Sequence, residues 1–226
     1  MQEDITRLGQ AASLLRAAYG PATGPDDDST WRRFVRVLMG IPSTHTASDT
    51  LSELLHSSAL ASPGQSAATS AATLVETLQP IPRGPQKSSV VRAVAAWWLA
   101  QFGDVESPEW TGGVTSYRMA LRQIRGLGPA TVDELLLFAA GLAVFPVDRT
   151  ALRVAVRHGW LDLPVDDEEV QSFFMSGQNR SGAALQELSL LLTKVGDAHC
   201  GRVPKCDGCP LQSMLPAGGP LSPESC

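Results

Sequence analysis

The chain has 226 residues, of which 43% are hydrophobic and 18% charged, and its formal net charge at pH 7 is −5. This composition is typical of a soluble globular protein, and no apolar run is long enough to span a membrane. The acidic balance argues against non-specific nucleic-acid binding, although residues 117–158 hold six arginines against three acids. The acidic start MQEDITRLGQ lacks a basic-then-apolar leader, so we expect a cytoplasmic protein, which in a bacterium includes the nucleoid.

Helical periodicity dominates the chain, and strand-like alternation is scarce. In chain order, the first predicted helix ends at Gly20-Pro21 and the second carries Trp31 to Leu38. The others cover residues 48–55, 88–102, 116–124, 130–141, 148–158 and 182–198. The small-residue segment ALASPGQSAATSAA (59–72) is predicted to be a mobile connection, and residues 104–114 a loop. About ten helices and no confident strand predict an all-α protein.

The stretch QIRGLGPATVDELLLF (123–138) predicts a helix–hairpin–helix. Gly126 and Gly128 tolerate unusual backbone angles and leave room for another backbone, and Pro129 suits the first turn of a helix. The exposed first-turn amides would then attract a phosphate, with Arg125 and Thr131 flanking them. The same spacing also fits a plain corner in which the glycines only make the bend.

A carboxylate follows the hairpin in VFPVDRTALRVAVRHGW (144–160). Asp148 begins a helix in which Arg149, Arg153 and Arg157 recur every four residues and therefore share one side. An acid beside such a stripe suggests a carboxylate held against nucleic acid, where it could stabilise a positive sugar centre and activate water. Alternatively, Asp148 is only a helix N-cap, worth about 1 kcal/mol.

All four cysteines lie in the last 27 residues, at positions 200, 206, 209 and 226. A disulfide framework would be spread through a short secreted chain, so the clustering favours a metal site. Closely spaced thiolates can wrap a small inorganic centre, and four of them can also hold zinc.

Together, the hairpin and the aspartate motif resemble the endonuclease III family of helix–hairpin–helix DNA glycosylases. Its members carry LPGVGRKTA and then VDTHIFRV, where this chain has IRGLGPATV and PVDRTALRV with a matching gap. The resemblance implies an all-α, two-domain fold, with a six-helix barrel over residues 30–142 and an iron–sulfur domain from residues 1–29 and 143–226. It makes Asp148 the catalytic aspartate. It also implies DNA contacts from the hairpin and its neighbour, at Arg125, Gly126, Leu127, Gly128, Ala130, Thr131 and Arg149.

The cysteine spacing departs from the family pattern C-x6-C-x2-C-x5-C. The first gap is one residue shorter, and the fourth position falls on Leu215. The resemblance therefore predicts a [4Fe–4S] cluster held by Cys200, Cys206, Cys209 and Cys226, with zinc as the alternative metal; His199 is disfavoured as a ligand. Arg202 and Lys205 lie in the first cysteine loop, which presents basic residues to DNA in the family.

Two further departures concern catalysis. Bifunctional members carry a lysine two residues after the second glycine, where this chain has Ala130, so no Schiff base is expected at this position. Neither Lys87 nor Lys194 aligns as a replacement. The family's SAQATD segment, whose glutamine fills the gap left by the flipped base, corresponds to GIPSTHTASD, with Pro42 in place of the glutamine and His45 as a candidate plug.

The sequence thus predicts a monomeric, monofunctional DNA repair glycosylase that acts on a damaged or mispaired base in double-stranded DNA. One alternative is a non-catalytic DNA-damage-binding paralogue that keeps the clamp and the cluster. Another is a zinc-bearing protein-interaction module.

Overall fold

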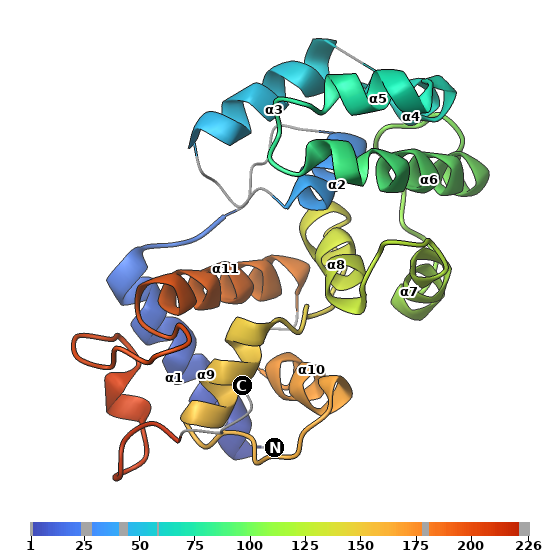
Figure 1. Cartoon of the computed structure of the whole chain (residues 1–226). Helices are drawn as coiled ribbons and strands as arrows, with labels where there is room; N and C mark the ends of the chain where they lie inside the picture. Colours follow the sequence, from blue (N-terminus) through green and yellow to red (C-terminus); the bar gives the residue numbers. More distant parts are fainter. Residues whose placement is uncertain (1, 24–28, 41–44, 58, 178–180, 222–226) are drawn as a thin grey trace. The chain divides into compact units, whose positions relative to one another are not determined.

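The computed structural model describes residues 2–23, 29–40, 45–57, 59–177 and 181–221. These residues form helices without a β-strand, which confirms the predicted all-α class. The chain divides into two compact units, Pro25–Gly141 and Met1–Gly24 with Leu142–Cys226 (Figure 1). Within the described ranges, no helix combines the length and the apolar character that a bilayer crossing requires.

The unit Pro25–Gly141 is built around one long central helix. Its elements are α2 (Thr30–Met39), α3 (His45–Ser57), α4 (Pro63–Ala68), α5 (Ala71–Thr77), α6 (Gly84–Phe102), α7 (Val114–Arg122), α8 (Pro129–Glu134) and the π-helix η1 (Leu135–Ala139), which continues α8. Helix α6 packs against α2, α4 and α5, while η1 packs against α2. The hairpin therefore rests on a helical core of its own unit.

Tryptophans fill the centre of this unit. The Trp31 and Trp98 rings meet edge to face, with 5.4 Å between centroids, and Trp98 meets Trp110 at 5.7 Å. Each buried indole needs a hydrogen-bond acceptor, and both find a backbone carbonyl at 2.9 Å: Trp31 donates to Leu60 and Trp98 to Val105. Trp110 and Val105 belong to the loop after α6, which confirms that predicted loop and shows how the core anchors it.

The predicted mobile connection over residues 59–72 is wrong, because this segment forms α4 and the start of α5. Both helices begin at serine caps. Ser62 Oγ accepts from the Gln65 N–H at 3.2 Å, and Ser70 Oγ accepts from the Thr73 N–H at 3.1 Å. The serines therefore end the loop by satisfying orphan amides of short helices.

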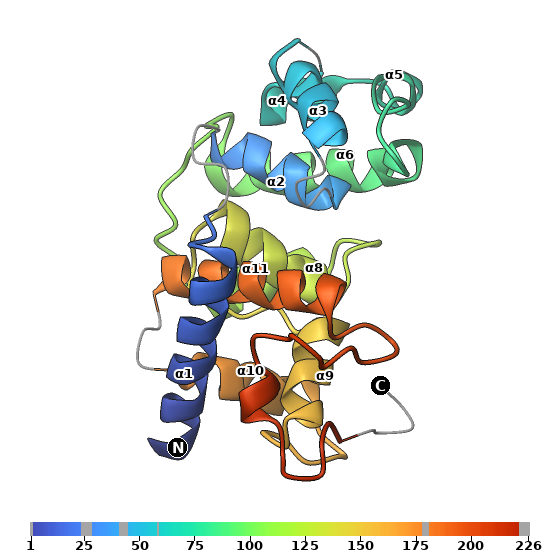
Figure 2. The same ribbon diagram turned by 90° about the vertical axis from the view of Figure 1, so that its left-hand side faces the viewer.

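The second unit contains α1 (Gln2–Tyr19), α9 (Arg149–Arg157), α10 (Asp167–Met175), α11 (Gly182–Ala198) and the 3-10 helix η2 (Gln212–Met214). Helix α11 packs against both α1 and α9 (Figure 2). Arg16 and Glu187 join α1 to α11 through a forked ion pair, and this hydrogen bonding lowers the pKa of Glu187. Gly196 lets α11 approach α9 closely, because a Cβ there would lie 2.4 Å from Thr150 Cγ2.

Helix α10 was not among the predicted helices, although the sequence carries its start signal. Asp166 and Glu169 form a capping box, in which each side chain accepts from the other residue's N–H. In contrast, the predicted helix over 182–198 is confirmed, and Ser181 caps it through the Ala184 N–H.

Candidate functional site

The hairpin needs glycine at position 126 for two reasons. Gly126 has φ +98°, a left-handed conformation that side chains rarely adopt, and a Cβ there would lie 2.8 Å from Val90 Cγ2 in α6. The next residue, Leu127, is half-buried and donates its N–H to the Ile124 carbonyl at 3.1 Å. This part of the hairpin is therefore shaped by its own fold.

Gly128 differs from Gly126. Its φ of −80° suits any residue, and a Cβ there would meet no atom within 4 Å. It is exposed, as are Arg125 and Pro129 beside it. The N–H groups of Gly128, Ala130 and Thr131 make no hydrogen bond within the described part of the chain, because the first bond of α8 runs from a later residue to the Gly128 carbonyl. An open set of backbone donors at a helix start is suited to an anion.

An ion pair fixes the two helices of the hairpin against each other. Arg118 in α7 binds Asp133 in α8 with both nitrogens, at 2.7 Å from Nε to Oδ1 and 2.9 Å from the terminal nitrogen to Oδ2. Asp133 is only 3% exposed, so the pair is shielded from solvent screening on the carboxylate side. The sequence analysis did not single out this pair.

Asp148 is the N-cap of α9, as the alternative interpretation of its position allowed. Its Oδ1 accepts from the Ala151 N–H at 2.7 Å. The side chain is half-buried, and among the described residues no hydrogen-bond donor reaches Oδ2. One carboxylate oxygen is therefore held in place while the other remains available.

The predicted arginine stripe does not act as one surface. Arg149 is exposed, but Arg153 donates through Nε to the Cys200 carbonyl at 3.0 Å. Arg157 is only 5% exposed and donates to the carbonyls of Gly201, at 2.7 Å, and Arg202, at 3.0 Å. Two of the three arginines thus brace the cysteine loop, and Arg149, the one that was expected to contact DNA, is the exposed member.

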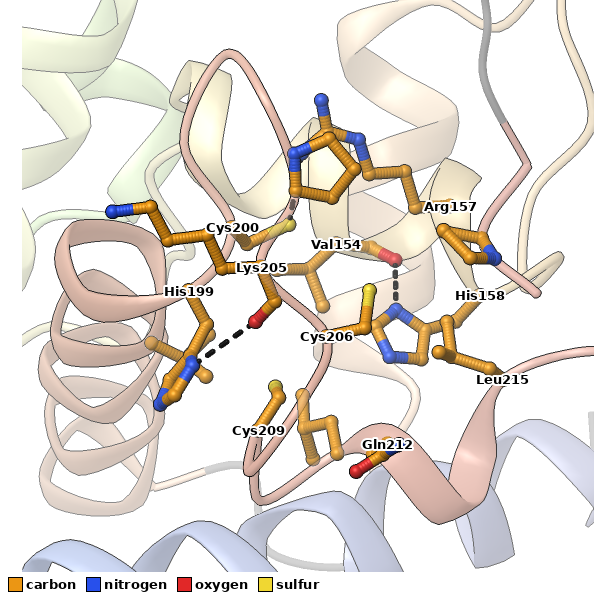
Figure 3. Close-up of a pocket in the computed structure, with 14 residues that line it drawn as sticks. Val154, Arg157, His158, His199, Cys200, Lys205, Cys206, Cys209, Gln212 and Leu215 are labelled. Atoms are coloured by element: carbon orange, nitrogen blue, oxygen red, sulfur yellow. Dashed lines mark hydrogen bonds between the residues drawn. The ribbon is translucent and has the colours of Figure 1, made fainter.

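The three described cysteines meet around one cavity. Cys200, Cys206 and Cys209 are free thiols that line it together with His158 and other residues (Figure 3). Burial raises the pKa of Cys209, and the neighbouring Cys200 and Cys206 sulfurs add to this shift. Cys226 lies outside the described residues.

The donor set is one that thiolate-bound centres use. No three His, Cys, Asp or Glu side chains of the described chain form a group that could hold a metal ion as they stand. Three free thiols nevertheless line one cavity, and each thiolate of an iron–sulfur cluster binds a different iron atom. The thiols could serve as ligands of a cluster or of zinc.

Two buried polar groups beside the cavity make no hydrogen bond of normal geometry among the described residues, the Tyr19 hydroxyl and the His158 Nε2, although the Leu211 carbonyl lies near the imidazole. Burial raises the pKa of Tyr19, and the nearby Cys209 thiol adds to this shift. The buried Arg157 guanidinium reaches Cys200 Sγ at 3.3 Å, and the described residues offer it no carboxylate. A metal-bound thiolate would supply the missing negative charge.

The other predicted contact residues fall into two groups. Arg202 and Lys205 are exposed on the cysteine loop, whose base is closed by a 2.8 Å hydrogen bond from the Lys205 N–H to the His199 carbonyl. His45 is the first residue of α3, but its side chain lies outside the described part of the structure, as does Pro42.

Lys87 has a structural role. It is one of the two lysines that the sequence analysis weighed as replacements for the family's catalytic lysine. Lys87 Nζ donates to the Leu38 carbonyl at 2.7 Å, close to the end of α2. Burial lowers the pKa of Lys87, the positive charge of Arg83 adds to this, and Glu134 opposes it. This ammonium group therefore completes the end of a helix.

Comparison with known proteins identifies the fold. No family model matches the chain. A protein of Methanocaldococcus jannaschii, "Putative DNA repair glycosylase MJ1434", is 24% identical over 142 residues, which make up 62% of this chain and 64% of that protein. The match thus spans less than two thirds of the relative's length.

Solved structures match over nearly the whole chain. A trapped endonuclease III–DNA covalent intermediate has a TM-score of 0.70 at 18% identity, covering 94% of this chain and 96% of that one. A thermostable thymine-DNA glycosylase has a TM-score of 0.68 at 13% identity, with 94% and 95% covered. The H. pylori 3-methyladenine DNA glycosylase bound to 1,N6-ethenoadenine has a TM-score of 0.63 at 15% identity, with 86% and 97% covered. The chain has the fold of endonuclease III and related glycosylases, which confirms the resemblance at the level of the fold.

Proposed function

We propose that this protein is a DNA glycosylase that removes a damaged or mispaired base from double-stranded DNA by hydrolysis. The fold shared with endonuclease III and the match to a DNA repair glycosylase support the class of reaction. The observation that carries the proposal for this chain is the half-buried Asp148, which keeps one carboxylate oxygen free at the start of α9. In this proposal, Pro25–Gly141 corresponds to the helical barrel and the other unit to the cysteine-bearing domain.

Asp148 would act on the sugar of a nucleotide turned out of the duplex. Departure of the base leaves positive charge on the sugar, and a fixed carboxylate stabilises that charge and orients water for attack. The 2.7 Å bond between Oδ1 and the Ala151 N–H would hold the group in place, so that Oδ2 faces the reacting centre without reorganisation. The same carboxylate thus serves as helix cap and as catalytic group.

The hairpin would hold the DNA strand through its backbone. Unpaired amides at Gly128, Ala130 and Thr131 can donate to a phosphate, and the exposed Arg125 adds charge beside them. Arg149, Arg202 and Lys205 are exposed and would provide further phosphate contacts. These contacts are independent of sequence, as a search for rare lesions requires.

The reaction would stop at base removal. Ala130 occupies the position at which an amine would attack the sugar, and alanine can neither attack nor accept a proton. Lys87 is engaged at the end of α2, where its ammonium group donates to the Leu38 carbonyl. We propose a monofunctional enzyme that acts as a monomer.

A [4Fe–4S] cluster would complete the second unit. Cys200, Cys206 and Cys209 would hold it, and Arg153 and Arg157 would tie their loop to α9. When bound, such a cluster supplies stable cross-linking of the loop that carries Arg202 and Lys205. The assignment of the remaining ligand to Cys226 stays a prediction.

A panel of lesion-containing duplexes tests the proposal. Base loss and strand breakage are scored separately, the first by cleavage after alkali and the second without it. We expect at least one lesion to give alkali-dependent cleavage only. Binding of damaged duplex without base loss from any substrate would instead support the non-catalytic paralogue.

A further inference from the structure

The cysteine cavity has three described thiols, whereas a cubane cluster has four irons, each of which needs a ligand. The cavity is lined by two histidines besides the cysteines, His158 and His199. The position where a fourth cysteine would be expected is Leu215, which also lines the cavity and has no donor atom. The described site therefore offers an imidazole as its remaining candidate ligand.

His158 is built into the structure as a metal-binding imidazole would be. It follows α9 directly, is 8% exposed, and packs against Trp160 with 5.0 Å between ring centroids. Its Nδ1 lies 2.8 Å from the Val154 carbonyl, one helical turn earlier, which can only accept. The proton is therefore on Nδ1, and in the neutral ring Nε2 carries a lone pair.

No donor reaches that lone pair in the described chain. His158 Nε2 is buried and makes no hydrogen bond of normal geometry. Burial lowers the pKa of His158, and the backbone carbonyls of Val154 and Leu211 near the ring oppose this shift. Figure 3 shows the ring beside Cys206, with Nε2 on the side away from Val154. Metal-binding histidines usually donate the other ring N–H to a carbonyl or carboxylate in this manner.

His199 is less suitable. Its Nδ1 lies 3.1 Å from the Lys205 carbonyl, but the contact is exposed, and no buried nitrogen of His199 lacks a partner. Its ring lies at the edge of the loop that Arg202 and Lys205 occupy, where solvent can satisfy the second nitrogen. His158 and His199 thus form a matched pair, one buried with an Nε2 that makes no hydrogen bond, the other half-buried.

We infer that His158 Nε2 is the fourth protein ligand of an iron–sulfur cluster held by Cys200, Cys206 and Cys209. This inference rests on the cluster proposed above. Since imidazole is neutral where a thiolate is negative, the cluster would carry less negative charge and have a higher reduction potential than one with four thiolates. Cys226 is the competing ligand that the experiment must exclude.

Pulsed EPR on the full-length protein tests the ligand directly. The chain is produced with 15N-labelled histidine, reconstituted anaerobically with ferrous iron and sulfide, and reduced. We expect about four irons per chain and a strong 15N coupling to the cluster. The coupling should persist in His199→Ala and disappear in His158→Cys, which keeps a cluster with a lower potential. Cys226→Ser should retain both the iron and the coupling.

Three results would overturn the inference. The first is an intact cluster in the wild-type protein without histidine coupling, together with iron loss in Cys226→Ser. The second is a coupling that survives in His158→Cys. The third is failure of the wild-type protein to take up iron. Base release from lesion duplexes is measured on the same samples. Failure of the proposed glycosylase activity can then be distinguished from failure of the ligand assignment.

Discussion

Arg157 donates to the Sγ atom of Cys200 at 3.3 Å, and the same guanidinium binds the carbonyls of the two residues after that cysteine. One buried arginine thereby fixes a ligand candidate and the loop that follows it. An isolated β-bridge between Cys200 and Pro204 closes the base of the loop, and the Arg157 side chain binds the carbonyls inside it.

Replacing Arg157 by Met should destabilise the protein by about 2–3 kcal/mol, because the part-buried carbonyls of Gly201 and Arg202 lose their charged donor. Iron content after reconstitution should fall in parallel, since Cys200 is no longer positioned. Chemical denaturation and iron analysis measure the two effects. Arg149→Met, at an exposed position on the same helix, is the control and should stay within about 0.5 kcal/mol of the wild type. Equal stability and iron content in both variants would contradict the bracing role.

Gly126→Ala should lower stability by at least about 1–2 kcal/mol, the cost of a left-handed conformation for a side chain. The added methyl group would also lie 2.8 Å from Val90 Cγ2, which must move. Thermal unfolding measures the loss. An unchanged melting temperature would mean that the hairpin adopts another backbone conformation.

Gly128→Ala separates the two interpretations of the hairpin. The residue has negative φ and open space, so alanine should leave stability unchanged or raise it by about 0.4–1 kcal/mol. If the backbone grips a phosphate, the methyl group should weaken binding to duplex DNA about tenfold, or 1.4 kcal/mol. Unchanged affinity in a stably folded variant would favour the plain corner.

Ala130→Lys should introduce the missing amine. We expect borohydride to trap this variant on DNA containing an abasic site, because the amine forms an imine with the sugar that borohydride reduces to a stable bond. Ala130→Met controls for side-chain length and should give no adduct. Strong trapping of the wild-type protein would show that another amine already performs this chemistry.

The sequence predicted most of the helices, because their ends carry local signals. Residues 182–198 match the observed α11, since Ser181 supplies its cap and leucines its buried face. The prediction of a mobile connection over residues 59–72 was wrong because serines are equally common in loops and at helix caps. Only the packing of α4 and α5 on α6 decides between the two. The π-helix η1 could not be predicted, as its leucines fit an α-helix equally well.

The sequence identified single residues of the candidate site better than it identified the groups that those residues contact. Spacing correctly put Arg153 and Arg157 on one side of α9, but the identity of the group they face depends on a loop more than 40 residues later. His158 carried no motif, and only its burial and its unsatisfied nitrogen draw attention to it. Asp148 was recognised both as a cap and as a carboxylate for chemistry, and the first of these is confirmed.

Asp148→Asn tests the central proposal most directly, because asparagine caps helices as well as aspartate does. Its side-chain oxygen can keep the bond to the Ala151 N–H, so stability should stay within about 1 kcal/mol of the wild type. Single-turnover base release from the preferred lesion duplex should fall at least about a hundredfold, with affinity for the duplex retained. Base release at the wild-type rate in this variant would contradict the proposal that Asp148 carries the chemistry.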